Sequence, residues 1–245
     1  SANNAVSYRV SILRGTGTGS FTAVATWFPM GYRPESIVSG DFNNDGNQDI
    51  VAVGSPTTNT HAISFLNGIG TGSFSPAVTY TLAADASVVG WDLNKGDYNG
   101  DGKLDVSYVK LGPSVTTSSV TCMLGNGLGA FPAITTYTLP GNITKMCTGD
   151  FNLDGKSDLA LPNTNTLFVK FGASSAPLSS TTTYTLPGAA VSIETADFNG
   201  DSNLDIAYAN SSVFRILLGS SSGTFSPAVP YSMGLSAQSF KAADF

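Results

Sequence analysis

The chain has 245 residues, of which 41% are hydrophobic and only 11% are charged, and its formal net charge is −6. Its 11 Lys and Arg residues are scattered singly, without the basic stripe that a phosphate backbone requires, so nucleic acid is not an expected partner. No apolar run approaches the length of a membrane span and the N-terminus has no signal-peptide pattern, so we expect a mature or excised segment with no membrane span.

The first strands of the chain establish an all-β pattern. The N-terminal SANNAVSYRVSILRG corresponds to the later YANSSVFRILLG, so it is predicted to continue a unit just after its loop. An apolar strand in ESIVSGDF then enters a loop, and DIVAVG, AISFLNG and AVTYTL follow as strands separated by turn signals. No stretch has helical periodicity, so each unit is predicted to be a four-stranded antiparallel sheet.

The loop between the first two of these strands concentrates oxygen atoms. DFNNDGNQD, Asp41–Asp49, places side-chain oxygens at positions 1, 3, 5 and 9, with Gly46 at position 6. Like charges crowded into one loop repel, which favours a bound cation. An EF-hand loop uses the same first, third and fifth positions and a main-chain carbonyl at position 7, here that of Asn47. Position 12 is Ala52, inside a predicted strand, so the loop is not an EF-hand.

The same loop occurs three more times along the chain, as DYNGDGKLD (97–105), DFNLDGKSD (150–158) and DFNGDSNLD (197–205). The four loops hold 12 of the 17 acidic residues, so the acidity is local and directed at metal. Ordinary turns also concentrate Asp, Asn and Gly. A turn alone, however, gives no reason for an acidic ninth residue in every loop, so we predict up to four Ca²⁺ sites.

The repeat predicts the fold. Loop starts are spaced by 56, 53 and 47 residues, and a fifth loop would begin at Asp244. Five units of about 47–57 residues, each with four short strands, are typical of β-propeller blades. Stacked blades bury the faces that a single blade leaves exposed. We therefore predict one all-β domain over residues 1–245.

The loops also resemble a known family. Each is preceded by Gly or Ala and followed by an apolar strand, and in this they resemble FG-GAP (VCBS-type) repeats, the calcium-binding blades of integrin α-subunit propellers and of many extracellular proteins. The resemblance covers the whole chain and implies metal ligation by the side chains of positions 1, 3, 5 and 9, to which the EF-hand comparison adds the carbonyl of position 7. The implied ligands are Asp41, Asn43, Asp45, Asn47, Asp49; Asp97, Asn99, Asp101, Lys103, Asp105; Asp150, Asn152, Asp154, Lys156, Asp158; and Asp197, Asn199, Asp201, Asn203, Asp205. Ser202 replaces the glycine of position 6, and if that position needs a positive φ, the Asp197 loop is the weakest site.

Two arrangements of the blades remain open. The C-terminal SFKAADF could supply the inner strand that the first unit lacks, which would close a ring of five blades. Alternatively, the chain is a fragment of a seven-bladed propeller, which would allow oligomers. We favour five blades, because the inner and outer strands both count to five.

Aromatic residues at one repeated position are candidate ligand-binding residues. Each follows a Gly- or Ser-rich turn by six residues: Trp27, Tyr80, Tyr137, Tyr184 and Tyr231. Their rings could stack on sugars, but an outer-strand tyrosine could equally pack between blades. Positions that vary between units are better candidates for specific binding. Three residues before each loop start stand Val38, Asn94, Cys147, Glu194 and Lys241, and the insertions at 54–60 and 112–119 vary equally.

Catalysis has little support in the sequence. The single His61 ends a polar insertion and is predicted to be a solvated loop residue. Asp85 and Asp92 are the only nearby carboxylate pair outside the loops, so a propeller glycosidase is a minor alternative. Cys122 and Cys147 are predicted to be free buried thiols, with a disulfide between them as the other possibility.

The sequence therefore predicts a secreted or cell-surface recognition module rather than an enzyme, stabilised by calcium and binding a glycan or an extracellular surface or matrix protein. The second hypothesis is a purely architectural or self-assembling repeat unit of a larger adhesin. Extracellular calcium concentrations would keep even modest sites filled, which is the reason for the predicted location.

Overall fold

The computed structural model describes residues 8–57, 60–82, 91–111, 116–210, 213–232, 234 and 239–242. Throughout these ranges the chain is all-β, as predicted, and no helix in them is long and apolar enough to cross a membrane. The predictions for Asp85, Asp244 and parts of the two insertions concern residues outside the described ranges.

The described strands form one two-stranded and four four-stranded antiparallel sheets. The two-stranded sheet contains β1 (Arg9–Gly15) and β2 (Phe21–Pro29). The others contain β3 (Arg33–Gly40), β4 (Asp49–Thr57), β5 (Thr60–Leu66) and β6 (Val78–Leu82); β7 (Trp91–Gly96), β8 (Asp105–Leu111), β9 (Thr117–Leu124) and β10 (Ala133–Pro140); β11 (Cys147–Gly149), β12 (Asp158–Pro162), β13 (Thr166–Gly172) and β14 (Leu178–Thr185); and β15 (Ser192–Ala196), β16 (Asp205–Asn210), β17 (Val213–Leu217) and β18 (Val229–Ser232).

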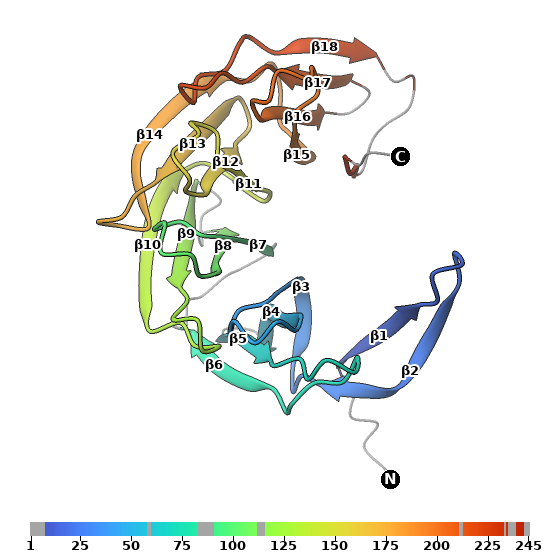
Figure 1. Cartoon of the computed structure of the whole chain (residues 1–245). Helices are drawn as coiled ribbons and strands as arrows, with labels where there is room; N and C mark the ends of the chain where they lie inside the picture. The colour runs from blue at the N-terminus through green and yellow to red at the C-terminus, as the bar shows by residue number, and fades with distance from the viewer. Residues whose placement is uncertain are drawn as a thin grey trace.

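Each four-stranded sheet is one propeller blade whose strands run in chain order from the centre outward. Figure 1 shows β3, β7, β11 and β15 toward the middle of the molecule and β6, β10, β14 and β18 on its perimeter. Adjacent blades face one another across apolar layers. One such layer joins Val51, Ile63 and Phe65 of one blade to Val106 and Met123 of the next. Burial between neighbouring blades is the main stabilising term in this architecture, as expected for stacked repeats.

The blades form an open arc rather than a closed ring (Figure 1). The C-terminal segment 239–242 lies against the last blade, where the Phe240 N–H donates to Ser192 Oγ (3.4 Å) and the Phe240 ring meets Phe214 edge-on at 5.1 Å. Among the described residues this segment makes no strand pairing with β1 or β2. The shared closing blade therefore stays a prediction, and the segment occupies the place next to β15 that an inner strand of a further blade would take.

Two predictions about individual residues are decided by the fold. Cys122 on β9 and Cys147 on β11 are both buried and free, which confirms the thiol interpretation. The prediction for His61 was wrong. His61 lies on β5 with only 2% of its surface exposed, and its Nδ1 is 3.3 Å from Ser55 Oγ. It is buried because β5 already begins at Thr60, within the segment that the sequence analysis assigned to the insertion.

Candidate functional site

The four acidic loops join the first and second strands of the four complete blades. Their ninth residue is the first residue of the second strand and is fully buried in every case: Asp49, Asp105, Asp158 and Asp205. Each of these carboxylates accepts two main-chain hydrogen bonds, one from the second loop residue and one from the glycine that follows or ends the third strand. The pairs are Asp49 with Phe42 (2.9 Å) and Gly68 (2.8 Å), Asp105 with Tyr98 (2.9 Å) and Gly125 (2.8 Å), Asp158 with Phe151 (2.8 Å) and Gly172 (2.8 Å), and Asp205 with Phe198 (2.9 Å) and Gly219 (2.7 Å).

This buried carboxylate gives the ninth position a structural role that the sequence analysis did not recognise. It ties the loop to the third strand of its own blade, and the recurring glycine after that strand was the available signal. A Cβ added at Gly68 would lie 2.1 Å from the carbonyl oxygen of Gln48, so no side chain fits there. An acidic ninth residue therefore stabilises the blade whether or not the loop holds a metal.

The other loop oxygens point into the loop. In the second loop, Asp97 Oδ1 accepts the N–H groups of Gly100 (2.7 Å) and Asp101 (3.1 Å), and its Oδ2 accepts that of Gly102 (2.7 Å). Asn99 Oδ1 accepts the Asp101 N–H at 3.0 Å. Position 1 accepts the position-6 N–H in all four loops, so the carboxylates of each loop are gathered on one turn.

Burial disfavours the ionised form of the ninth residue in the first three loops. Burial raises the pKa of Asp105 to about 6, against the lowering effect of its two N–H donors, and the nearby Asp97 and Asp101 charges add to the increase. Burial likewise raises the pKa of Asp158 to about 6. The negative charge of the loop is thus only partly compensated by main-chain dipoles, and a cation would relieve the rest.

The chemistry of the donor set fits calcium. Each loop offers carboxylate, amide and main-chain carbonyl oxygens, which are hard ligands. Ca²⁺ binds six to eight oxygen ligands of this kind, and water completes its coordination shell. Within the described ranges, no three His, Cys, Asp or Glu side chains are arranged to hold a metal ion as they stand. Calcium binding therefore stays a prediction.

Position 6 of the fourth loop needs a positive φ, the condition on which the prediction for Ser202 depended. Ser202 has φ of +69°, in the left-handed region where Gly46, Gly102 and Gly155 sit in the other loops. Position 4 is also left-handed, and there Leu153 at +58° is the unfavourable residue. Gly100 and Gly200 stand at position 4 of the second and fourth loops. They indicated in the sequence that position 4 also needs a positive φ, and this signal was missed.

Replacing Ser202 with glycine is expected to stabilise the protein by about 1 kcal/mol, because a non-glycine residue in the left-handed region costs about 1–2 kcal/mol and glycine's greater entropy in the unfolded state offsets part of the gain. Urea denaturation in chelator measures the change. Ser202→Ala serves as the control, since it keeps the Cβ, and should give no gain. Equal stability of the glycine variant and the parent chain would contradict the strain argument.

The repeated aromatic position has two different environments. Tyr137 and Tyr184 pack between blades: the Tyr137 hydroxyl donates to the Leu178 carbonyl (2.9 Å) and accepts the Leu178 N–H (3.1 Å) of the next blade, while Tyr184 donates to Gly223 O (3.4 Å). Lys170 Nζ lies 4.6 Å above the Tyr137 ring. These two residues thus have the packing environment that the sequence analysis offered as the alternative to sugar stacking.

Trp27, Tyr80 and Tyr231 are exposed, by 49%, 37% and 52%. Tyr80 differs from Tyr137 and Tyr184 because its hydroxyl makes no hydrogen bond to any described residue of the next blade. A groove of about 310 Å³ lies there instead, between Tyr80 and the turn of the next blade that carries Leu128 and Gly129. The amides of Asn43 and Asn67 also line it, and Asn43 Nδ2 donates to Asn67 Oδ1. The first acidic loop is thereby connected to this groove.

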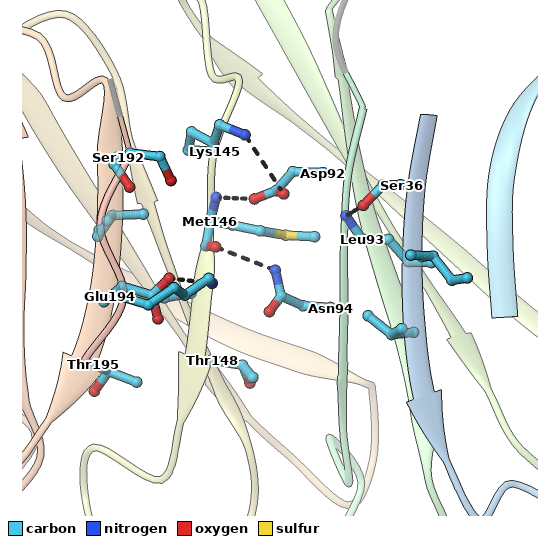
Figure 2. Close-up of a pocket in the computed structure, with 16 residues that line it drawn as sticks. Ser36, Asp92, Leu93, Asn94, Lys145, Met146, Thr148, Ser192, Glu194 and Thr195 are labelled. Atoms are coloured by element: carbon cyan, nitrogen blue, oxygen red, sulfur yellow. Dashed lines mark hydrogen bonds and ion pairs between the residues drawn. The ribbon is translucent and has the colours of Figure 1, made fainter. Parts of the chain in front are cut away.

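A second pocket, of about 400 Å³, lies among the inner strands. The five positions that vary between the repeats all line it: Val38, Asn94, Cys147, Glu194 and Lys241. Figure 2 shows Asp92 and Asn94 pointing from β7 toward β11, with Glu194 across the same space. Asp92 Oδ2 accepts the Met146 N–H (2.8 Å), and Lys241 forms an ion pair with Glu194. The fold thus gathers residues that the sequence could identify only as variable.

A solved structure has a similar fold. It belongs to a lectin from Agrocybe aegerita, described by its specific recognition of non-reducing terminal N-acetylglucosamine, and matches with a TM-score of 0.56 at 16% sequence identity. The match covers 91% of this chain and 66% of the lectin, so the chain spans about two thirds of that protein's length. No curated protein matches the sequence.

A family model places the repeats themselves. The model of the FG-GAP-like repeat matches residues 2–52, 41–108 and 97–161, which together cover more than half of the chain and include the first three acidic loops. The matched segments each contain a loop that joins the first two strands of a blade, the arrangement observed in the structure. The chain belongs to the FG-GAP-like repeat family.

Proposed function

We propose that the chain is an extracellular, calcium-stabilised recognition module that binds carbohydrate or, failing that, a surface or matrix protein. The observation that carries this proposal is the groove beside Tyr80. It combines an exposed aromatic ring, two side-chain amides and the exposed Leu128 in a space of about 310 Å³. Sites for small ligands typically combine apolar walls with a few placed polar groups in this way.

Carbohydrate is the ligand that suits this groove best. A sugar ring presents C–H groups on one face, which stack on an aromatic ring, and hydroxyls at its edge, which hydrogen-bond to amides such as that of Asn67. The fold shared with the N-acetylglucosamine-binding lectin supports the proposal and makes N-acetylglucosamine-terminated glycans the first probe.

Calcium would act through the loops on stability and on the groove. Asp41, Asn43, Asp45 and Asp49, with the Asn47 carbonyl, would hold it in the first loop, and their equivalents would do so in the other three. Because Asn43 donates to Asn67 Oδ1, an ion that fixes the first loop would also fix the groove floor. Millimolar extracellular calcium would keep modest sites filled, which is the basis of the proposed location.

The architectural alternative has an observation of its own. Leu13 and Phe21 in the two-stranded sheet are 63% and 69% exposed, and they lie at one end of the open arc. A repeat unit that assembles through this end would need no ligand. We propose a non-enzymatic role in either case.

Replacing Tyr80 with alanine is expected to weaken the binding of N-acetylglucosamine-terminated oligosaccharides at least tenfold, equivalent to about 1.4 kcal/mol. The loss follows from removal of the stacking face while the hydrophobic core stays intact. Titration calorimetry in calcium measures it. The matched control is Tyr231→Ala, which removes an exposed outer-strand tyrosine outside the groove and should leave affinity unchanged. If both variants bind as the parent chain does, the groove is not the site.

A further inference from the structure

The inner pocket is separate from the groove and from the acidic loops. Its walls come from β3, β7, β11 and β15, from the residues just before β11, and from the C-terminal segment, and they include neither Tyr80 nor any residue of the four loops. Its volume of about 400 Å³ falls in the range of pockets that hold small molecules. Whatever binds there would therefore be recognised by a different set of groups.

Two hydrogen-bond acceptors in this pocket accept no hydrogen bond from a described residue. Asp92 Oδ2 takes the Met146 N–H, but Asp92 Oδ1 is 4.0 Å from Lys145 Nζ, which is too long for a hydrogen bond. Asn94 uses its amino group to donate to the Met146 carbonyl at 3.2 Å, and no described residue donates to its Oδ1. Both side chains extend from β7 into the same space in Figure 2.

The charges are arranged with the anions inside and the cations at the rim. The side chains of Asp92 and Glu194 are each 20% exposed, whereas those of Lys145 and Lys241 are 45% and 82% exposed. Burial raises the pKa of the Asp92 carboxyl, and the neighbouring Glu194 charge contributes to the increase, so the two carboxylates share one electrostatic environment. Ion pairs to exposed lysines are weak and screened by water, so a ligand cation can replace the lysine tips easily.

These groups match one kind of ligand. A primary ammonium has three N–H donors and no acceptor, and the pocket presents oxygens of Asp92, Asn94 and Glu194 to it. The walls beside them are mixed: Val38, Leu93 and Met146 offer apolar surface, and Ser36 and Ser192 offer hydroxyls. A polyol ring that carries a free amine suits both the oxygens, through its ammonium group, and the mixed walls, through its C–H and hydroxyl groups.

We propose that the inner pocket binds an unacetylated amino sugar, with the ammonium group held by Asp92, Asn94 and Glu194. The displaced Lys145 and Lys241 ammonium groups then remain at the rim, where the ring hydroxyls can accept from them. This site is independent of the proposed Tyr80 groove, which is suited to neutral sugars.

The test is titration calorimetry of the whole chain with glucosamine, at a pH at which its amine is protonated, with N-acetylglucosamine and glucose titrated in parallel. Glucosamine is expected to bind at least tenfold more tightly than glucose to the Tyr80→Ala variant, in which the groove is disabled. Asp92→Asn and Glu194→Gln should each reduce glucosamine affinity at least tenfold. Both substitutions keep the side-chain shape, and Asp92→Asn keeps an acceptor for the Met146 N–H.

The matched control is Glu35→Gln, which removes an exposed carboxylate of β3 that does not line the pocket and should leave glucosamine binding unchanged. Equal affinity for glucosamine and glucose, or unchanged binding by both pocket variants, would overturn the proposal. None of these results bears on the Tyr80 groove, whose own test uses neutral N-acetylglucosamine glycans.

Discussion

Alanine in place of Asp158 is expected to lower the free energy of unfolding by about 3–5 kcal/mol. The carboxylate accepts the Phe151 and Gly172 N–H groups, both at 2.8 Å, in a fully buried position. An unsatisfied buried donor costs about 1–3 kcal/mol, and alanine leaves two of them. Urea denaturation in chelator measures the loss without any contribution from bound calcium.

The same loop supplies the control. Asp154 at position 5 is a carboxylate like Asp158, but its side chain is exposed. Asp154→Ala should therefore lower the free energy of unfolding in chelator by less than about 1 kcal/mol. Asp158→Asn keeps one acceptor oxygen and should fall between the two. Comparable losses for positions 5 and 9 in chelator would mean that the ninth residue is not the structural tie described above.

Removal of calcium is expected to lower the melting temperature by 10 °C or more. A ligand at a hundred times its Kd adds about 2.7 kcal/mol per site to the folded state. For a chain of this size, 1 kcal/mol corresponds to about 2–4 °C. Even two filled sites therefore account for about 10 °C, and the four loops offer up to twice that number.

Scanning calorimetry with calcium, with chelator and with calcium restored measures this effect. Asp97→Asn and Asp101→Asn together, which remove the charges of one half-buried and one exposed carboxylate of the same loop, should abolish part of the calcium-dependent increase and change the melt in chelator little. Magnesium at the same concentration is the matched ion, since it demands a smaller octahedral site. A melt unchanged by chelator would contradict calcium stabilisation.

The fold could be predicted from the sequence because its signals are local and repeated. Four loops between β-branched strands at intervals of about 50 residues specify blades, and blades have one way of burying their faces. The position of the C-terminal segment could not be predicted in the same way. It depends on side-chain contacts such as that of Phe240 with Phe214, which the repeated motif does not specify.

The site was predictable only in part, for a physical reason. Position 9 of each loop carries a repeated carboxylate, and repetition alone does not distinguish a metal ligand from an acceptor for buried N–H groups. The aromatic position shows the same ambiguity: Tyr137 and Tyr184 bond to the next blade, whereas Tyr80 faces a groove. The inner pocket was the hardest to foresee, because Asp92 and Glu194 come from different blades and meet only when the blades surround a common axis.

Recognition of carbohydrate is the central claim, and a glycan array probed with the calcium-loaded protein tests it most directly, with a chelated sample and the Tyr80→Ala variant alongside. We predict specific signal from glycans with terminal N-acetylglucosamine, reduced in chelator and lost in the variant. A blank array from folded, calcium-loaded protein would contradict the claim and favour the architectural role, for which the mass of the protein in solution would show assembly.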